Sequence, residues 1–106
     1  MTLPAPLQDL YRALPCSRKQ ATSISALALR LERDERIIRE QIKDLRELYR
    51  VPVIALPTRN GVWLTNDPAE LEHLIACQTS RARSIERSVR VLRQVRDSMS
   101  YSSSLF

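Results

Sequence analysis

The chain contains a single glycine, Gly61, among its 106 residues. Glycine adopts positive φ more readily than any other residue, and tight turns and phosphate-cradling loops depend on that freedom. A barrel with many tight turns, or a catalytic fold built on glycine-rich loops, would need more glycines. The one glycine follows Asn60, and Asn-Gly is the strongest short signal for a β-hairpin. We therefore expect one hairpin in a mainly helical chain.

The length and composition indicate one compact domain that folds by burying apolar side chains. Hydrophobic residues make up 43 % and charged residues 27 % of the chain, as in ordinary globular proteins. No stretch approaches the ~18 consecutive apolar residues of a membrane span, and the start lacks the pattern of a signal peptide. Two cysteines, Cys16 and Cys77, are too few for a disulfide framework. These features predict a cytoplasmic, nucleoid-associated protein with no membrane contact.

Apolar spacing and capping residues predict three helices in the first half of the chain. Residues 7–14 carry an apolar stripe with helical spacing. Ser23 is placed to cap a second helix, Ile24–Leu31, and Asp34 to cap a third over 35–50. The connection between the second and third helices is as short as in a helix-turn-helix. Strands at 53–56 and 62–64 then flank the Asn-Gly turn, with Trp63 expected in the core.

The last third of the chain predicts one long helix. Asp67 is expected to cap it, Pro68 to occupy its first position, and Glu70 to reach back to the N–H of the capping residue. An apolar seam with four- and three-residue steps follows, as in helices that pair with one another. We expect a homodimer through this seam, and the alternative is that its start packs on the first domain while the rest contacts another protein. The seam consists of Leu71, Ile75, Gln78, Ala82, Ile85, Val89 and Leu92.

These elements predict a mainly α chain with a small β-hairpin, in three parts. Residues 1–66 form the first domain, 67–99 the long helix and 100–106 a flexible tail. The net charge of +5 and a pI near 9.9 favour a polyanionic partner. All but two of the basic residues are arginines, whose forked donors suit phosphates and guanine edges.

The order helix, helix, short turn, helix, hairpin is the point of resemblance to a known family. Residues 18–65, through the segments ALALRL (26–31), RIIREQIKDLR (36–46), PVI (52–54) and GVWL (61–64), resemble the winged helix-turn-helix domains of bacterial regulators and phage-encoded DNA-binding proteins. The wing is similar to that of biotin-repressor-type domains. In that family the turn between the second and third helices usually contains a glycine, where this chain has Arg33.

The resemblance implies a sequence-specific transcriptional regulator of bacterial, phage or mobile-element origin that reads duplex DNA. Its third helix would enter the major groove, as the arc of basic residues on that helix also predicts. Base contacts are expected from Arg36, Arg39 and Lys43, and phosphate contacts from Arg46 and Arg50. The backbone would also be held near the second helix by Arg18, Lys19 and Thr22, and the minor groove entered by the wing at Arg59 and Asn60.

Two other interpretations of the pattern stay open. The basic residues of the third helix also have helical spacing to glutamates, so they could form solvated ion pairs only. The domain could then be an adaptor, or a replication or recombination accessory factor, that works mainly through protein contacts. No nucleophile, acid–base pair or metal-ligand spacing is identifiable, and His73 is the single histidine of the sequence, so we expect no enzyme, cofactor or metal.

Overall fold

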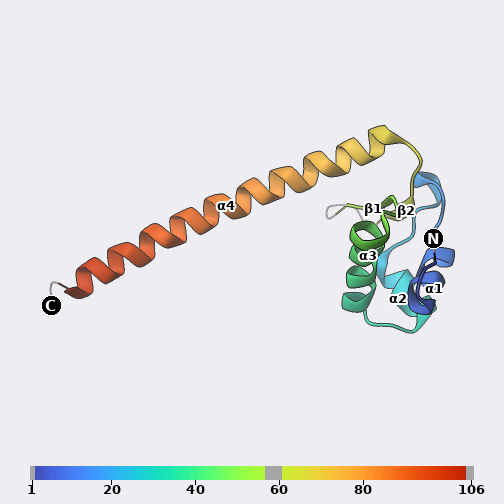
Figure 1. Cartoon of the computed structure of the whole chain (residues 1–106), viewed down its shortest axis with the longest axis horizontal. Helices are drawn as coiled ribbons and strands as arrows, with labels where there is room; N and C mark the ends of the chain where they lie inside the picture. The colour runs from blue at the N-terminus through green and yellow to red at the C-terminus, as the bar shows by residue number, and fades with distance from the viewer. Residues whose placement is uncertain (1, 57–60, 105–106) are drawn as a thin grey trace. The chain divides into compact units, whose positions relative to one another are not determined.

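The computed structural model of the chain describes the backbone of residues 2–56 and 61–104, with side chains up to residue 99. The chain divides into two compact units, Met1–Leu74 and Ile75–Phe106, so the boundary falls inside the last helix. Helices dominate both units, which confirms the mainly α class with a small hairpin and a long C-terminal helix. The described elements (Figure 1) are α1 (Ala5–Ala13), the 3₁₀ turn η1 (Arg18–Gln20), α2 (Ile24–Leu31), α3 (Glu35–Tyr49), β1 (Val53–Ala55), β2 (Val62–Leu64) and α4 (Pro68–Ser104).

The first three helices pack around one apolar core. Each helix turns its apolar stripe inward, and α2 contacts both α1 and α3. The hairpin closes this core from a further side, because one face of each short strand is buried against it. The buried residues of this core are Leu7, Leu10, Leu14, Leu27, Ala28, Ile38, Ile42, Leu45, Val51, Val53 and Val62.

Two of the three predicted helix caps are confirmed. The Ser23 hydroxyl accepts a hydrogen bond from the Ala26 N–H at 3.0 Å. At the start of α4 the Asp67 carboxylate accepts from the Ala69 N–H at 2.9 Å. Asp34 precedes α3 as predicted, but its side chain makes no capping hydrogen bond. Asp34 therefore occupies the predicted N-cap position, but the predicted hydrogen bond from its side chain to the helix is absent.

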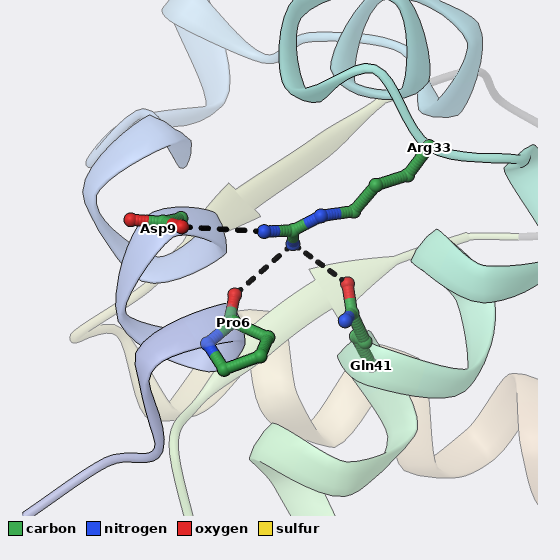
Figure 2. A network of polar contacts seen from close by, with 4 residues as sticks. All are labelled: Pro6, Asp9, Arg33 and Gln41. Carbon is green, nitrogen blue, oxygen red and sulfur yellow. Dashed lines mark hydrogen bonds and ion pairs between the residues drawn. The ribbon is translucent and has the colours of Figure 1, made fainter.

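The turn between α2 and α3 uses no glycine. Its left-handed residue is Glu32, with φ of 55°. Arg33, the next residue, turns its guanidinium back between the helices (Figure 2), where it donates to the Pro6 carbonyl at 3.0 Å and to Gln41 Oε1 at 2.9 Å. It also pairs with Asp9 at 3.3 Å. Arg33 thus connects α1, the turn and α3, and its side chain is 18 % exposed.

Replacing Arg33 with alanine is expected to lower the free energy of unfolding by about 1–3 kcal/mol. The substitution leaves the partly buried Gln41 amide oxygen of α3 without its charged donor, and it also removes the exposed hydrogen bond to the Pro6 carbonyl of α1. Arg30→Ala, at an exposed position of α2, is the matched control and should change stability by no more than about 0.5 kcal/mol. Urea unfolding of the two variants measures the difference, and equal effects would show that the Arg33 contacts contribute nothing.

The hairpin carries a second, smaller apolar cluster on its other face. β1 and β2 pair antiparallel, with Ile54 opposite Trp63. These two side chains are buried together with Leu74 of α4. Trp63 is 4 % exposed, so its predicted place in the core is confirmed. Leu74, which is not a member of the predicted seam, fastens the first turns of α4 to the hairpin.

Glu70 does not complete the predicted capping box. Its carboxylate accepts from the Trp63 indole N–H at 3.0 Å and from the Thr65 hydroxyl at 2.6 Å. The N–H of the capping residue, Asp67, donates instead to Thr65 Oγ1 at 3.0 Å. The reason is that a buried indole N–H needs an acceptor, and Glu70 is the carboxylate that reaches it.

Within the second unit α4 is a continuous helix. It ends at Ser104, whereas the sequence pattern predicted its last residue at 99. Neither glycine nor proline occurs between Ala69 and that end, so nothing in the backbone interrupts the ladder of hydrogen bonds. The side chains of residues 75–99 are exposed, apart from a half-buried Cys77.

Candidate nucleic-acid interface

The helix α3 has one buried face and one charged face. Ile38, Ile42 and Leu45 are 0 %, 3 % and 0 % exposed and hold the helix to the core. At 100° per residue, the basic residues of α3 lie on the opposite and flanking arc. The fold therefore presents a row of cations while the helix itself is anchored.

The three residues predicted to read bases are well-exposed cations of this row. The side chains of Arg36, Arg39 and Lys43 are 83 %, 63 % and 70 % exposed. Each lies at the limit of ion-pairing distance from a carboxylate of the same helix, and such exposed pairs are weak because water screens them. The pairs are Arg36–Glu40 at 3.9 Å, Arg39–Glu35 at 3.9 Å and Lys43–Glu47 at 4.0 Å.

Arg46 was expected to contact phosphate, and the structure gives its Nε a different partner. The Nε–H donates to the Val53 carbonyl at 2.9 Å, so the side chain connects α3 to β1. Burial lowers the pKa of the Arg46 guanidinium, and the adjacent Glu47 carboxylate acts against this. On the helical projection Arg46 stands only about 40° from Ile42. That proximity to the core face is the sequence signal that predicts its partly buried position.

The remaining predicted contacts lie outside α3 or at its end. Arg50 is exposed and caps α3 in the left-handed conformation, with φ of 55°. Arg18 and Lys19 are exposed on η1, which packs beside β2. Thr22 is half-buried, and its backbone pairs with that of Val62 in β2. Arg59 and Asn60 lie outside the described residues, so the predicted wing tip stays a prediction.

A feature that the sequence did not reveal joins the starts of α2 and α3. The Ser25 hydroxyl donates to Glu35 Oε1 at 2.9 Å. Beside it an open hollow of about 710 Å³ is lined in part by Leu29 and Ile37, which are 83 % and 36 % exposed. Charged and polar side chains, among them Glu32 and Asp34, line the rest of the hollow.

The net positive charge is distributed unevenly between the two units. The second unit carries six arginines, at positions 81, 83, 87, 90, 93 and 96, against Glu86 and Asp97. The first unit holds the other eleven of the seventeen basic residues and ten of the twelve acidic ones. A DNA contact by the first unit must therefore depend on where its cations are placed, not on its total charge.

The first residue of the predicted dimer seam packs on the hairpin cluster of its own chain. Leu71 is half-buried and packs against the cluster of Ile54, Trp63 and Leu74, so it belongs to the first unit. The reason is that the hairpin offers an apolar surface next to the helix start. The rest of the seam, Ile75, Gln78, Ala82, Ile85, Val89 and Leu92, is exposed, with 55 % for Ile75, 55 % for Ile85, 39 % for Val89 and 66 % for Leu92.

Neither a metal site nor a membrane-spanning helix is found in the described part of the chain. Across residues 2–56 and 61–99 no three His, Cys, Asp or Glu side chains gather as metal ligands would. None of the helices in the described ranges is long and apolar enough to cross a bilayer. No protein-family model matches the chain, and neither curated proteins nor solved structures gave a match.

Proposed function

We propose that the chain is a winged helix-turn-helix regulator that binds duplex DNA through the exposed cations of α3. The observation that carries the proposal is the placement of Arg36, Arg39 and Lys43. All three are exposed on a helix whose opposite face is fully buried. An α-helix fits the major groove, about 12 Å wide, and long forked side chains on it reach the base edges.

The weak ion pairs on α3 are compatible with this role. The carboxylates at 3.9–4.0 Å hold the cations loosely, and a phosphate or a guanine edge offers shorter, charge-assisted hydrogen bonds in their place. The acidic residues also reduce non-specific attraction to DNA, because they nearly balance the cations of the first unit. Base contacts then have to supply a larger share of the binding energy, as a specific regulator requires.

The alternative is an adaptor or accessory factor that works through protein contacts. The hollow beside Leu29 and Ile37 favours it, because these apolar side chains are exposed next to the α2–α3 turn. An adaptor would bind DNA weakly or not at all. An architectural factor would bind it with a strong salt dependence and little sequence preference.

Selection of bound duplexes from fragmented genomic DNA, followed by titration of the best fragment, tests the proposal. A specific regulator should bind that fragment about 10³-fold or more tightly than random duplex at the same salt concentration. Equal affinities for the two would identify an architectural factor, and absence of binding would favour the adaptor.

Replacing Arg39 with alanine should weaken binding to the selected fragment by about 5- to 150-fold if its guanidinium reads a base. The effect on random duplex should be smaller, since base contacts are made only on the specific site. Arg87→Ala, an exposed arginine of α4, serves as the control. Fluorescence anisotropy with both duplexes separates the outcomes: an equal effect on both reassigns Arg39 to phosphate, and no effect removes it from the interface.

We also propose a homodimer through α4. Its support is the row of exposed apolar side chains from Ile75 to Met99, which would be an unusual liability in a monomer. Two copies would present two DNA-binding units, as regulators that read paired half-sites do. Sedimentation of the purified chain at micromolar concentration should give twice the monomer mass of 12.2 kDa.

A further inference from the structure

The exposed seam of α4 is nearly self-complementary when the helix is turned end for end. Within the second unit the same spacing continues past Leu92 to Arg96 and Met99. The row therefore has eight positions: Ile75, Gln78, Ala82, Ile85, Val89, Leu92, Arg96 and Met99. The four- and three-residue steps assign them alternately to the two core positions of a heptad. The large apolar members are 39–66 % exposed, so a single copy leaves the row uncovered.

We propose that the occupant of this seam is a second copy of α4 that runs antiparallel, with Arg87 at the midpoint of each helix. This inference rests on the proposed homodimer and adds its direction and register. In this register every core position meets the other type of core position, as antiparallel packing requires. The facing pairs are Ile75 with Met99, Gln78 with Arg96, Ala82 with Leu92, and Ile85 with Val89.

Two layers distinguish this register from others. Ala82 is the smallest side chain of the seam, and here it faces the large side chain of Leu92. The layer is then filled without a void, as close packing requires. The two polar members, Gln78 and Arg96, share one layer, where the amide oxygen of Gln78 can accept from the guanidinium. Arg96 already pairs with its own Asp97 at 3.1 Å, which offsets part of its charge.

A parallel, in-register pair fits the same residues less well. It would place Ala82 against Ala82 and leave the layer underfilled. It would also place the two Arg96 guanidiniums against each other in the seam, where like charges repel and are partly desolvated. It has two electrostatic advantages at the edge of the interface: an ion pair between Arg81 and Glu86, and separation of the two Glu86 carboxylates, which face each other near the midpoint of the antiparallel pair. Both are edge contacts that solvent screens.

The antiparallel register has a consequence for the assembly. Rise along a helix is about 1.5 Å per residue, so the two Ile75 residues would lie about 36 Å apart along the pair. The first units of the two copies would be joined to opposite ends of the pair. A parallel pair would join both to the same end.

Disulfide trapping tests the register in the full-length chain. Cys16→Ser and Cys77→Ser remove the native thiols, and Ala82→Cys and Leu92→Cys are then made in separate chains, one of them with a mass tag. Both positions are exposed in the single chain, so neither change disturbs its core. The two variants are mixed at high ionic strength, which screens repulsion between the arginine-rich helices, and oxidised mildly.

The antiparallel register predicts that the mixed disulfide between the two variants dominates and that each variant alone yields little disulfide dimer. Efficient disulfide dimers of each variant alone would show a parallel pair and overturn the register, although not the homodimer. A sedimenting monomer with no disulfide in any mixture would overturn both. No DNA is present in these experiments, so their outcome is independent of the proposed role of α3.

Discussion

Replacing Arg36, Arg39 and Lys43 together with alanine is expected to weaken binding to duplex DNA by about 100-fold or more. Each side chain is exposed and loosely paired, so each is available for a base edge or a phosphate. The slope of log K against log salt should also become shallower by about 0.9 for each phosphate that the variant no longer neutralises. The fold should persist, because alanine is the best helix former and the ion pairs that the variant removes are exposed.

The matched control removes the same charge from the other unit. Arg83, Arg87 and Arg90 are exposed arginines of α4, and their joint replacement with alanine also lowers the net charge by three. This control should weaken DNA binding far less than the α3 variant does, and only through long-range attraction, which salt screens. If the α4 variant were weakened as much as the α3 variant, the proposed interface on α3 would be wrong.

Replacing Leu45 with alanine is expected to lower the free energy of unfolding by about 2–5 kcal/mol. Leu45 is 0 % exposed and is the α3 residue that lies deepest, together with Ile38, in the apolar core of the three helices. Truncation removes buried methyl groups and leaves a cavity that close-packed neighbours fill only in part. Because Leu45 belongs to the face that anchors α3, the same variant should also bind DNA less well at temperatures near its midpoint of unfolding.

Leu48→Ala is the control for that prediction. Leu48 lies almost one turn further along α3 but is 69 % exposed, so its truncation should change stability by no more than about 0.5 kcal/mol. Urea unfolding followed by Trp63 fluorescence measures both variants. Equal destabilisation by the two substitutions would contradict the described orientation of α3.

The elements themselves were predictable from local chemistry. Apolar spacing located α1 to α3, the Asn-Gly turn located the hairpin, and Asp67-Pro68 located the start of α4. These signals act within a few residues along the chain, so one sequence is enough to detect them. The core face of α3 followed in the same way, since Ile38, Ile42 and Leu45 fall on one side of a helix.

The contacts that the sequence did not predict are those between elements. Arg46 donates to β1, Glu70 accepts from Trp63, and Leu71 packs on the hairpin. From the sequence, each of these side chains was expected to have another role: Arg46 in phosphate contact, Glu70 in helix capping and Leu71 in the dimer seam. Tertiary packing determined their partners, and a helical projection alone cannot show which neighbour a residue at the edge of a face will meet.

The most direct test of the central claim is a titration of the ¹⁵N-labelled chain with the selected duplex, followed by amide chemical shifts. We expect the largest changes at the exposed side of α3, around Arg36, Arg39 and Lys43, and at the start of α2. Arg81 to Asp97 should change little on DNA addition at a fixed dimer concentration. Changes confined to that segment of α4, with α3 unaffected, would contradict the claim that α3 binds DNA.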